Sequence, residues 1–159
     1  MRLSHRGETT VHVDAPPRTI VDDITTVELR HELVDGLLDP ESDDVRWILP
    51  GLQVAGIGVR AAACIRVTVE AHQPERATVR IVGDPVPGFT PCALDIVLTA
   101  VPSAHGGSDV HATFGVDVEL KLPRIARPIA QRVLDHEVAR VRDTLVARIA
   151  DHYGDVVPA

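Results

Sequence analysis

Two of the eight histidines stand where they invite a metal-binding interpretation. His12 and His111 both fall at polar positions of predicted strands, and two imidazoles on adjacent strands can converge on a divalent ion. No third ligand accompanies them, and outward-facing histidines on solvated strands are usually hydrated. The sequence therefore favours solvated side chains and predicts no metal site.

A second candidate for chemistry is Glu137, which follows His136 in the last predicted helix. The pair lacks the second histidine of an H-E-x-x-H zinc motif, because position 140 is arginine. Glu137 falls at the edge of the apolar stripe of that helix, and a carboxylate at a cavity margin can act as a general acid or base. The competing interpretation, which we favour, is an exposed residue paired with Arg140 three positions later.

Motifs for nucleotide, serine or thiol chemistry are missing from the sequence. Gly56-Ile57-Gly58 lacks the third glycine and the following helix of a dinucleotide-binding loop, and there is no G-x-S-x-G or Walker sequence. Cys64 and Cys92 stand in separate apolar runs, and we interpret them as reduced core thiols. No cofactor is predicted, and a protein without enzymatic activity is favoured over an enzyme.

Charge and length restrict the classes of partner and architecture. Lysine and arginine number 16 against 23 acidic residues, and the net charge of -7 would repel nucleic-acid phosphates. We predict a single domain over residues 1–159, with its core in 8–153 and loose termini. No apolar run approaches the roughly 20 residues of a membrane span, and no export signal precedes the first strand. We therefore expect a cytoplasmic protein without a transmembrane segment, and the sequence leaves a homodimer open.

The periodicity of apolar residues divides the chain into strands and helices. Alternation predicts strands over 9–14, 45–49, 52–57, 65–72, 77–81, 92–100 and 110–122. Pro16 and Pro17 suit the first turn of a short helix, and apolar residues at helical spacing predict a second over 29–37. The last helix follows Pro128 and ends before Gly154, and one apolar stripe follows it: Ala130, Leu134, Val138, Val141, Leu145 and Ile149.

The apolar face of such a sheet must be covered, and the only element long enough to cover it is the last helix. We therefore predict an α+β fold in which a curved antiparallel sheet of about seven strands surrounds a long C-terminal helix. Two short helices follow the first strand.

This order of elements, together with the phrase VDAPPRTIV at residues 13–21, resembles the START-like (SRPBCC) helix-grip superfamily of polyketide cyclases and lipid-transfer domains. The family often has Trp or Phe shortly after the proline phrase, whereas this chain has Val21 and Asp22. The resemblance implies a cavity between the sheet and the C-terminal helix that opens near the short helices and holds an apolar molecule. With 3% aromatic residues, the chain would line such a cavity mostly with aliphatic side chains.

The candidate ligand contacts are therefore apolar. Trp47, Phe89 and Phe114 are the large side chains available to a cavity, and Trp47 and Phe89 stand beside loops, where pockets tend to open. From the last helix, the stripe that includes Leu134, Val138 and Val141 either walls a pocket or fills it.

Three functions remain open on this basis. The favoured one is binding or transport of a small hydrophobic molecule or a lipid. The first alternative is a cyclase or dehydratase-like enzyme in which Glu137 or an inward histidine moves a proton. The second is a noncatalytic interaction module with a filled core, and the interior of the fold distinguishes the three.

Overall fold

In the computed structural model, residues 1–25, 46–49, 53–54, 57–58, 60–153 and 157–158 are described. Five long strands form most of the sheet: β1 (Arg2–Val13), β5 (Ala61–Gln73), β6 (Arg76–Pro85), β7 (Thr90–Pro102) and β8 (Ser108–Glu119). The short strands β2 (Arg46–Leu49) and β9 (Val157–Pro158) extend its two edges, which gives the order β2-β5-β6-β7-β8-β1-β9. The expected α+β architecture is confirmed, and five of the strands in the sheet are long.

The sheet is mixed rather than purely antiparallel. All the long neighbours pair antiparallel, but the beginnings of β5 and β7 also pair parallel, Ala61 with Thr90 and Ala62 with Pro91. The cause is the length of β6. Because β6 ends at Pro85, it does not separate the first residues of β5 and β7, which pair directly with each other. The prediction of an antiparallel sheet is therefore wrong at this corner.

The first strand begins at Arg2, seven residues before the predicted start at Thr9. It pairs with β8 over twelve residues, from Arg2 opposite Glu119 to Val13 opposite Ser108. Leu3 is 1% exposed and belongs to the core. The predicted core boundary at residue 8 and the loose N-terminus are therefore wrong. The inward positions of this segment include His5 and Gly7, which carry no apolar signal, so its alternation did not indicate a strand.

Short elements account for the other differences from the predicted pattern. The helix α1 (Pro17–Thr25) follows β1 as expected, whereas the second helix, predicted over 29–37, lies outside the described residues. The predicted strand 52–57 is instead a separate two-stranded hairpin of β3 (Gln53–Val54) and β4 (Ile57–Gly58). The strand β8 ends at Glu119, before the predicted end at Leu122.

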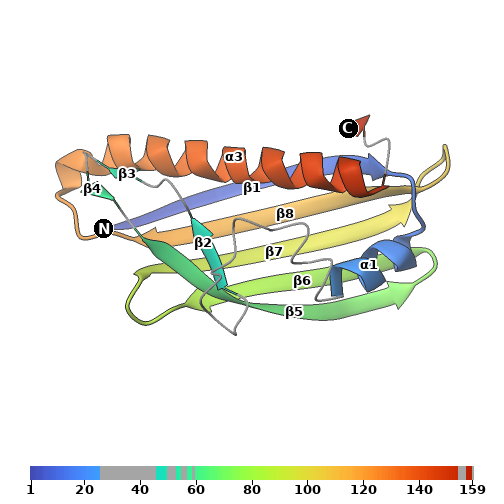
Figure 1. The fold of residues 1–159 in the computed structure, drawn as a ribbon. Helices are drawn as coiled ribbons and strands as arrows, with labels where there is room; N and C mark the ends of the chain where they lie inside the picture. Colours follow the sequence, from blue (N-terminus) through green and yellow to red (C-terminus); the bar gives the residue numbers. More distant parts are fainter. Residues whose placement is uncertain (26–45, 50–52, 55–56, 59, 154–156, 159) are drawn as a thin grey trace.

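The long helix α3 (Arg127–Tyr153) follows the 3-10 turn η1 (Arg124–Ala126) and lies along the inner face of the sheet (Figure 1). Its 27 residues give a length of about 40 Å at 1.5 Å per residue. A strand of 12 residues spans about 40 Å as well. The two layers therefore match in length, and Pro128 falls in the first turn, where proline is tolerated.

Among the described residues the buried core forms three clusters, two of which pack against α3. At one end, Leu134 and Val138 of α3 pack with Leu3, Leu94 and Val118 of the sheet. At the other end, Ile20 of α1 packs with Val13 and Val110, and Val146, Ile149 and Tyr153 of α3 lie against this second cluster. The interior between these two packed ends contains the site described next.

Candidate functional site

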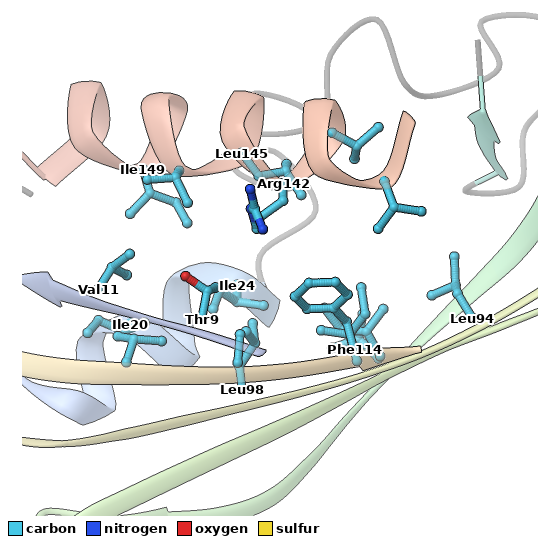
Figure 2. A pocket seen from close by; sticks show the side chains of 18 of the residues that line it. Thr9, Val11, Ile20, Ile24, Leu94, Leu98, Phe114, Arg142, Leu145 and Ile149 are labelled. Atoms are coloured by element: carbon cyan, nitrogen blue, oxygen red, sulfur yellow. The ribbon is translucent and has the colours of Figure 1, made fainter. Parts of the chain in front are cut away.

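An apolar cavity of about 220 Å³ lies between the inner face of the sheet and α3 (Figure 2). The sheet supplies inward side chains from all five long strands: Thr9, Val11 and Val13 of β1, Ile65 and Val67 of β5, Ile81 of β6, Cys92, Leu94, Ile96 and Leu98 of β7, and Val110, Ala112, Phe114 and Val116 of β8. The helices supply the remaining described lining: Ile20 and Ile24 of α1, and Val138, Val141, Arg142, Leu145, Val146, Ile149 and Tyr153 of α3.

Local sequence explains why these side chains share one space. Lining residues of β7 and β8 recur every second position, as required for one face of a strand. Those of α3 recur at intervals of three and four, as required for one face of a helix. Several of them, including Leu98, Ala112 and Leu145, are only half-buried although they face inward. The surface they retain faces the cavity.

Within the described lining, polar oxygen or nitrogen atoms come from three side chains. Thr9 contributes a hydroxyl from β1, and Arg142 a guanidinium from α3. Tyr153 contributes the third, and its hydroxyl donates a 2.7 Å hydrogen bond to Asp23 Oδ2 of α1. Burial raises the pKa of Tyr153, and the bond to Asp23 and its negative charge raise it further. The phenol is therefore a neutral donor that joins the end of α3 to α1.

The cavity thiol, Cys92, is chemically quiet. Its side chain is buried, and burial raises the pKa of Cys92 to about 12, with a smaller contribution from the charge of Asp117. A neutral thiol is a poor nucleophile, so Cys92 contributes apolar surface. Both cysteines are free, as the sequence predicted.

Beside the cavity lies a cluster that sequence reasoning missed. The imidazole of His5 stacks on the ring of Phe114, with centroids 6.0 Å apart and planes 9° apart. His5 Nδ1 is 2.8 Å from Asp135 Oδ1 of α3, and Gln131 Nε2 donates to the same oxygen at 2.9 Å. The hydrogen bond with His5 lowers the pKa of Asp135 most, against the opposing effect of burial. His5 lay in the supposed loose terminus, which concealed this contact between sheet and helix.

The predicted ligand-binding residues are only partly brought together. Phe114, Val138 and Val141 line the cavity, whereas Leu134 is packed in the core cluster at one end of α3. Phe89 is not in the described lining, and the guanidinium of Arg60 lies 5.2 Å from the centre of its ring. Trp47 of β2 pairs through its backbone with Ala63 of β5, and the side chain of Trp47 is not among those described. That these residues bind a ligand remains a prediction.

Glu137 lies against the helix rather than in the described cavity wall. Glu137 is 7% exposed, and its Oε2 accepts hydrogen bonds from Nη2 of Arg140 at 2.9 Å and from Nε of Arg140 at 3.3 Å. The ion pair at a spacing of three residues is the one that the sequence favoured, but the expected exposure of Glu137 is wrong, because the residue is buried. A carboxylate held in this way is a structural group, and the lining that the structure describes contains no carboxylate and no histidine.

The two histidines first considered as metal ligands make separate contacts. His12 Nδ1 is 3.1 Å from Asp109 Oδ1, and His111 Nδ1 is 2.8 Å from Thr10 Oγ1. Across the described part of the chain, no group of three or more histidine, cysteine or acidic side chains is placed to hold a metal ion. None of the described helices has a stretch that is both long and apolar enough to span a bilayer.

Comparison with solved structures places the fold. A conserved protein from Geobacillus kaustophilus superposes with a TM-score of 0.58 at 14% identity, over 94% of this chain and 95% of that chain. The Zhui aromatase/cyclase from Streptomyces sp. R1128 superposes with a TM-score of 0.55 at 13% identity, over 94% and 93% of the two chains. No family model and no curated protein sequence matches this chain. The helix-grip fold expected from the sequence is therefore confirmed.

Proposed function

We propose that this protein, which has the helix-grip fold of the START-like proteins, binds a small hydrophobic molecule or lipid in the cavity between the sheet and α3. The observation that carries the proposal is the cavity itself, an apolar space lined by five strands and two helices. An unfilled apolar space forgoes dispersion contacts on every side and costs stability in the free protein. An apolar ligand would restore those contacts on binding.

The size of the cavity limits the ligand. Its volume of about 220 Å³ exceeds the roughly 150 Å³ of an engineered cavity that holds benzene. It lies below the roughly 300 to 1,000 Å³ of pockets for drug-sized molecules. We therefore propose a ligand whose buried part is larger than one aromatic ring and smaller than a drug. The mostly aliphatic lining suits an alkyl chain or a compact alicyclic body.

The two alternatives receive less support. A filled interaction module is disfavoured because the interior between the two core clusters is open. A cyclase or dehydratase needs a group that moves a proton on the bound substrate, and the described cavity wall offers neither a carboxylate nor a histidine for this role. The aromatase/cyclase named above shares the fold alone. The single domain over 1–159, the cytoplasmic location and the homodimer remain proposals.

A fluorescence titration with N-phenyl-1-naphthylamine, an uncharged apolar probe, tests the proposal. We expect a saturable rise in emission at one site per chain, reversed by an excess of decanol, which competes for the same space. Native mass spectrometry of the freshly purified protein should also show a copurified small molecule on part of the population. The absence of saturable emission from a protein whose folding is verified by circular dichroism would contradict the proposal. Saturable emission that no aliphatic competitor reverses would contradict it as well.

A further inference from the structure

Arg142 carries the single full charge among the described cavity-lining side chains. It lies on the same helical face as Val138, four residues earlier, and Leu145, three residues later, and both of these also line the cavity. Figure 2 shows its guanidinium projecting from α3 into the space above Thr9 and Phe114. An arginine at a position that the helical pattern assigns to the interior thus faces a wall that is otherwise uncharged and mostly aliphatic.

The surroundings of Arg142 place it where the cavity meets solvent. Its side chain is 40% exposed although it lines the cavity, so part of it reaches solvent. Arginine can lay its aliphatic stem along apolar surface while its charged end stays hydrated. A ligand whose apolar part fills the cavity would therefore present its other end to this guanidinium.

The present partner of Arg142 leaves the guanidinium available. Nε and Nη2 both contact Asp143 Oδ1 at 3.1 Å, and Asp143 is its immediate neighbour with a side chain that is 72% exposed. Exposed ion pairs of this kind contribute little, because water competes for both partners. A ligand carboxylate offers two oxygens to the planar fork of the guanidinium, a stronger arrangement than two donors on one oxygen.

We propose that the cavity selects amphipathic molecules with one carboxylate, with the alkyl body between sheet and helix and the carboxylate on Arg142 at the opening. This rests on the proposed function and specifies its substrate class. The overall charge of -7 repels anions in general, so a preference for a carboxylate must arise locally. Arg142 is the charge that supplies it, and Thr9, on the facing wall, adds a hydroxyl near the same space.

The test compares two ligands of equal chain length, decanoate and decanol, at pH 8 and low salt, each measured by displacement of N-phenyl-1-naphthylamine. The wild-type protein should bind decanoate more tightly than decanol. Arg142→Met keeps the stem but removes the charge, and it should weaken decanoate roughly tenfold, the value of one charge-assisted hydrogen bond. The affinity of this variant for decanol should stay within about twofold.

Arg132→Met is the matched control, because Arg132 is exposed on the same helix and is not in the described lining. It removes the same charge and should leave both affinities unchanged. An equal ratio of decanoate to decanol affinity in wild type and Arg142→Met would overturn the inference while leaving the proposed function standing. An equal loss of affinity for decanoate in both variants would also overturn it, since the effect would then come from the overall charge of the protein. Failure of probe and both ligands to bind would overturn the proposed function and the inference with it.

Discussion

Gly7 of β1 lies directly opposite Phe114 of β8, and the ring of Phe114 occupies the space that a side chain at position 7 would need. A Cβ atom at Gly7 would lie 2.6 Å from Phe114 Cζ and 2.8 Å from Cε2. The same ring stacks on His5, whose Nε2 would lie 3.5 Å from that Cβ. The absence of a side chain at Gly7 thus sets where this cavity-lining ring lies.

Gly7→Ala should therefore displace the Phe114 ring and destabilise the protein. We expect a loss of about 1–3 kcal/mol in the free energy of unfolding, the usual cost of overpacking, measured by urea denaturation, together with weaker binding of the apolar probe. Gly115→Ala is the matched control, because its Cβ would meet only the exposed, flexible side chain of Arg6 at 2.9 Å. Equal effects of the two substitutions would show that the ring does not depend on Gly7.

The hydrogen bond between Tyr153 and Asp23 predicts a late titration of the phenol. Because the chain has a single tyrosine, the near-ultraviolet absorbance of the phenolate reports this residue alone. Its midpoint should lie above the ordinary value of about 10 in the folded protein and return to about 10 in urea. Since the folded-state pKa is raised, the associated stability is complete below pH of about 10 and is lost as the pH rises through the folded value.

Asp23→Asn separates the two causes of this shift. It removes the charge but keeps the burial, which is the larger cause, so the midpoint should fall part of the way toward the unfolded value. A tyrosine that titrates at the same pH in native and urea-unfolded protein would contradict the contact between α1 and α3.

The contact between His5 and Asp135 predicts that replacing Asp135 lowers the free energy of unfolding at neutral pH and has less effect at acidic pH. The pKa of Asp135 is lowered in the folded protein, so its contribution is present above the unfolded value of about 3.9 and is lost as the pH falls through the folded value. Asp135→Asn should reduce the free energy of unfolding at pH 7 by under about 1 kcal/mol, since the Asp135 side chain is 48% exposed. Denaturant titrations should show this difference shrinking below pH of about 4.

Asp151→Asn provides the control for charge, because Asp151 is exposed on the same helix. It should give a smaller effect at pH 7 than Asp135→Asn. A deficit in Asp135→Asn that stays constant from neutral to acidic pH would mean that the carboxylate contributes nothing through its ionisation.

The sequence predicted the elements whose pattern is local. The alternation of β8 and the apolar stripe of α3 are confirmed, because in each element the spacing of the apolar residues alone indicates which face is buried. The first half of β1 was missed because its inward positions include Gly7 and His5, which carry no apolar signal of their own. Their inward positions depend on Phe114 and Asp135, more than a hundred residues away.

A cavity was expected from the family resemblance, but which side chains line it could not be predicted, for a related reason. Leu134 and Leu145 lie on one stripe of α3, yet Leu134 is packed in the core and Leu145 lines the cavity. The two leucines differ in the sheet side chains that lie opposite them, and the position of those side chains depends on the register of strand pairing. Arg142 could have been found, since its spacing from Val138 and Leu145 already assigns it to the inner face.

Filling the cavity tests the account most directly. Ala112 is a small lining residue at the centre of β8, and Thr113 is its exposed neighbour on the opposite face of the strand. With N-phenyl-1-naphthylamine as the probe, Ala112→Phe should abolish saturable binding, whereas Thr113→Phe, which adds a ring outside the cavity, should bind as the wild type does. Equal binding by both folded variants would contradict the central claim that the ligand lies between the sheet and α3.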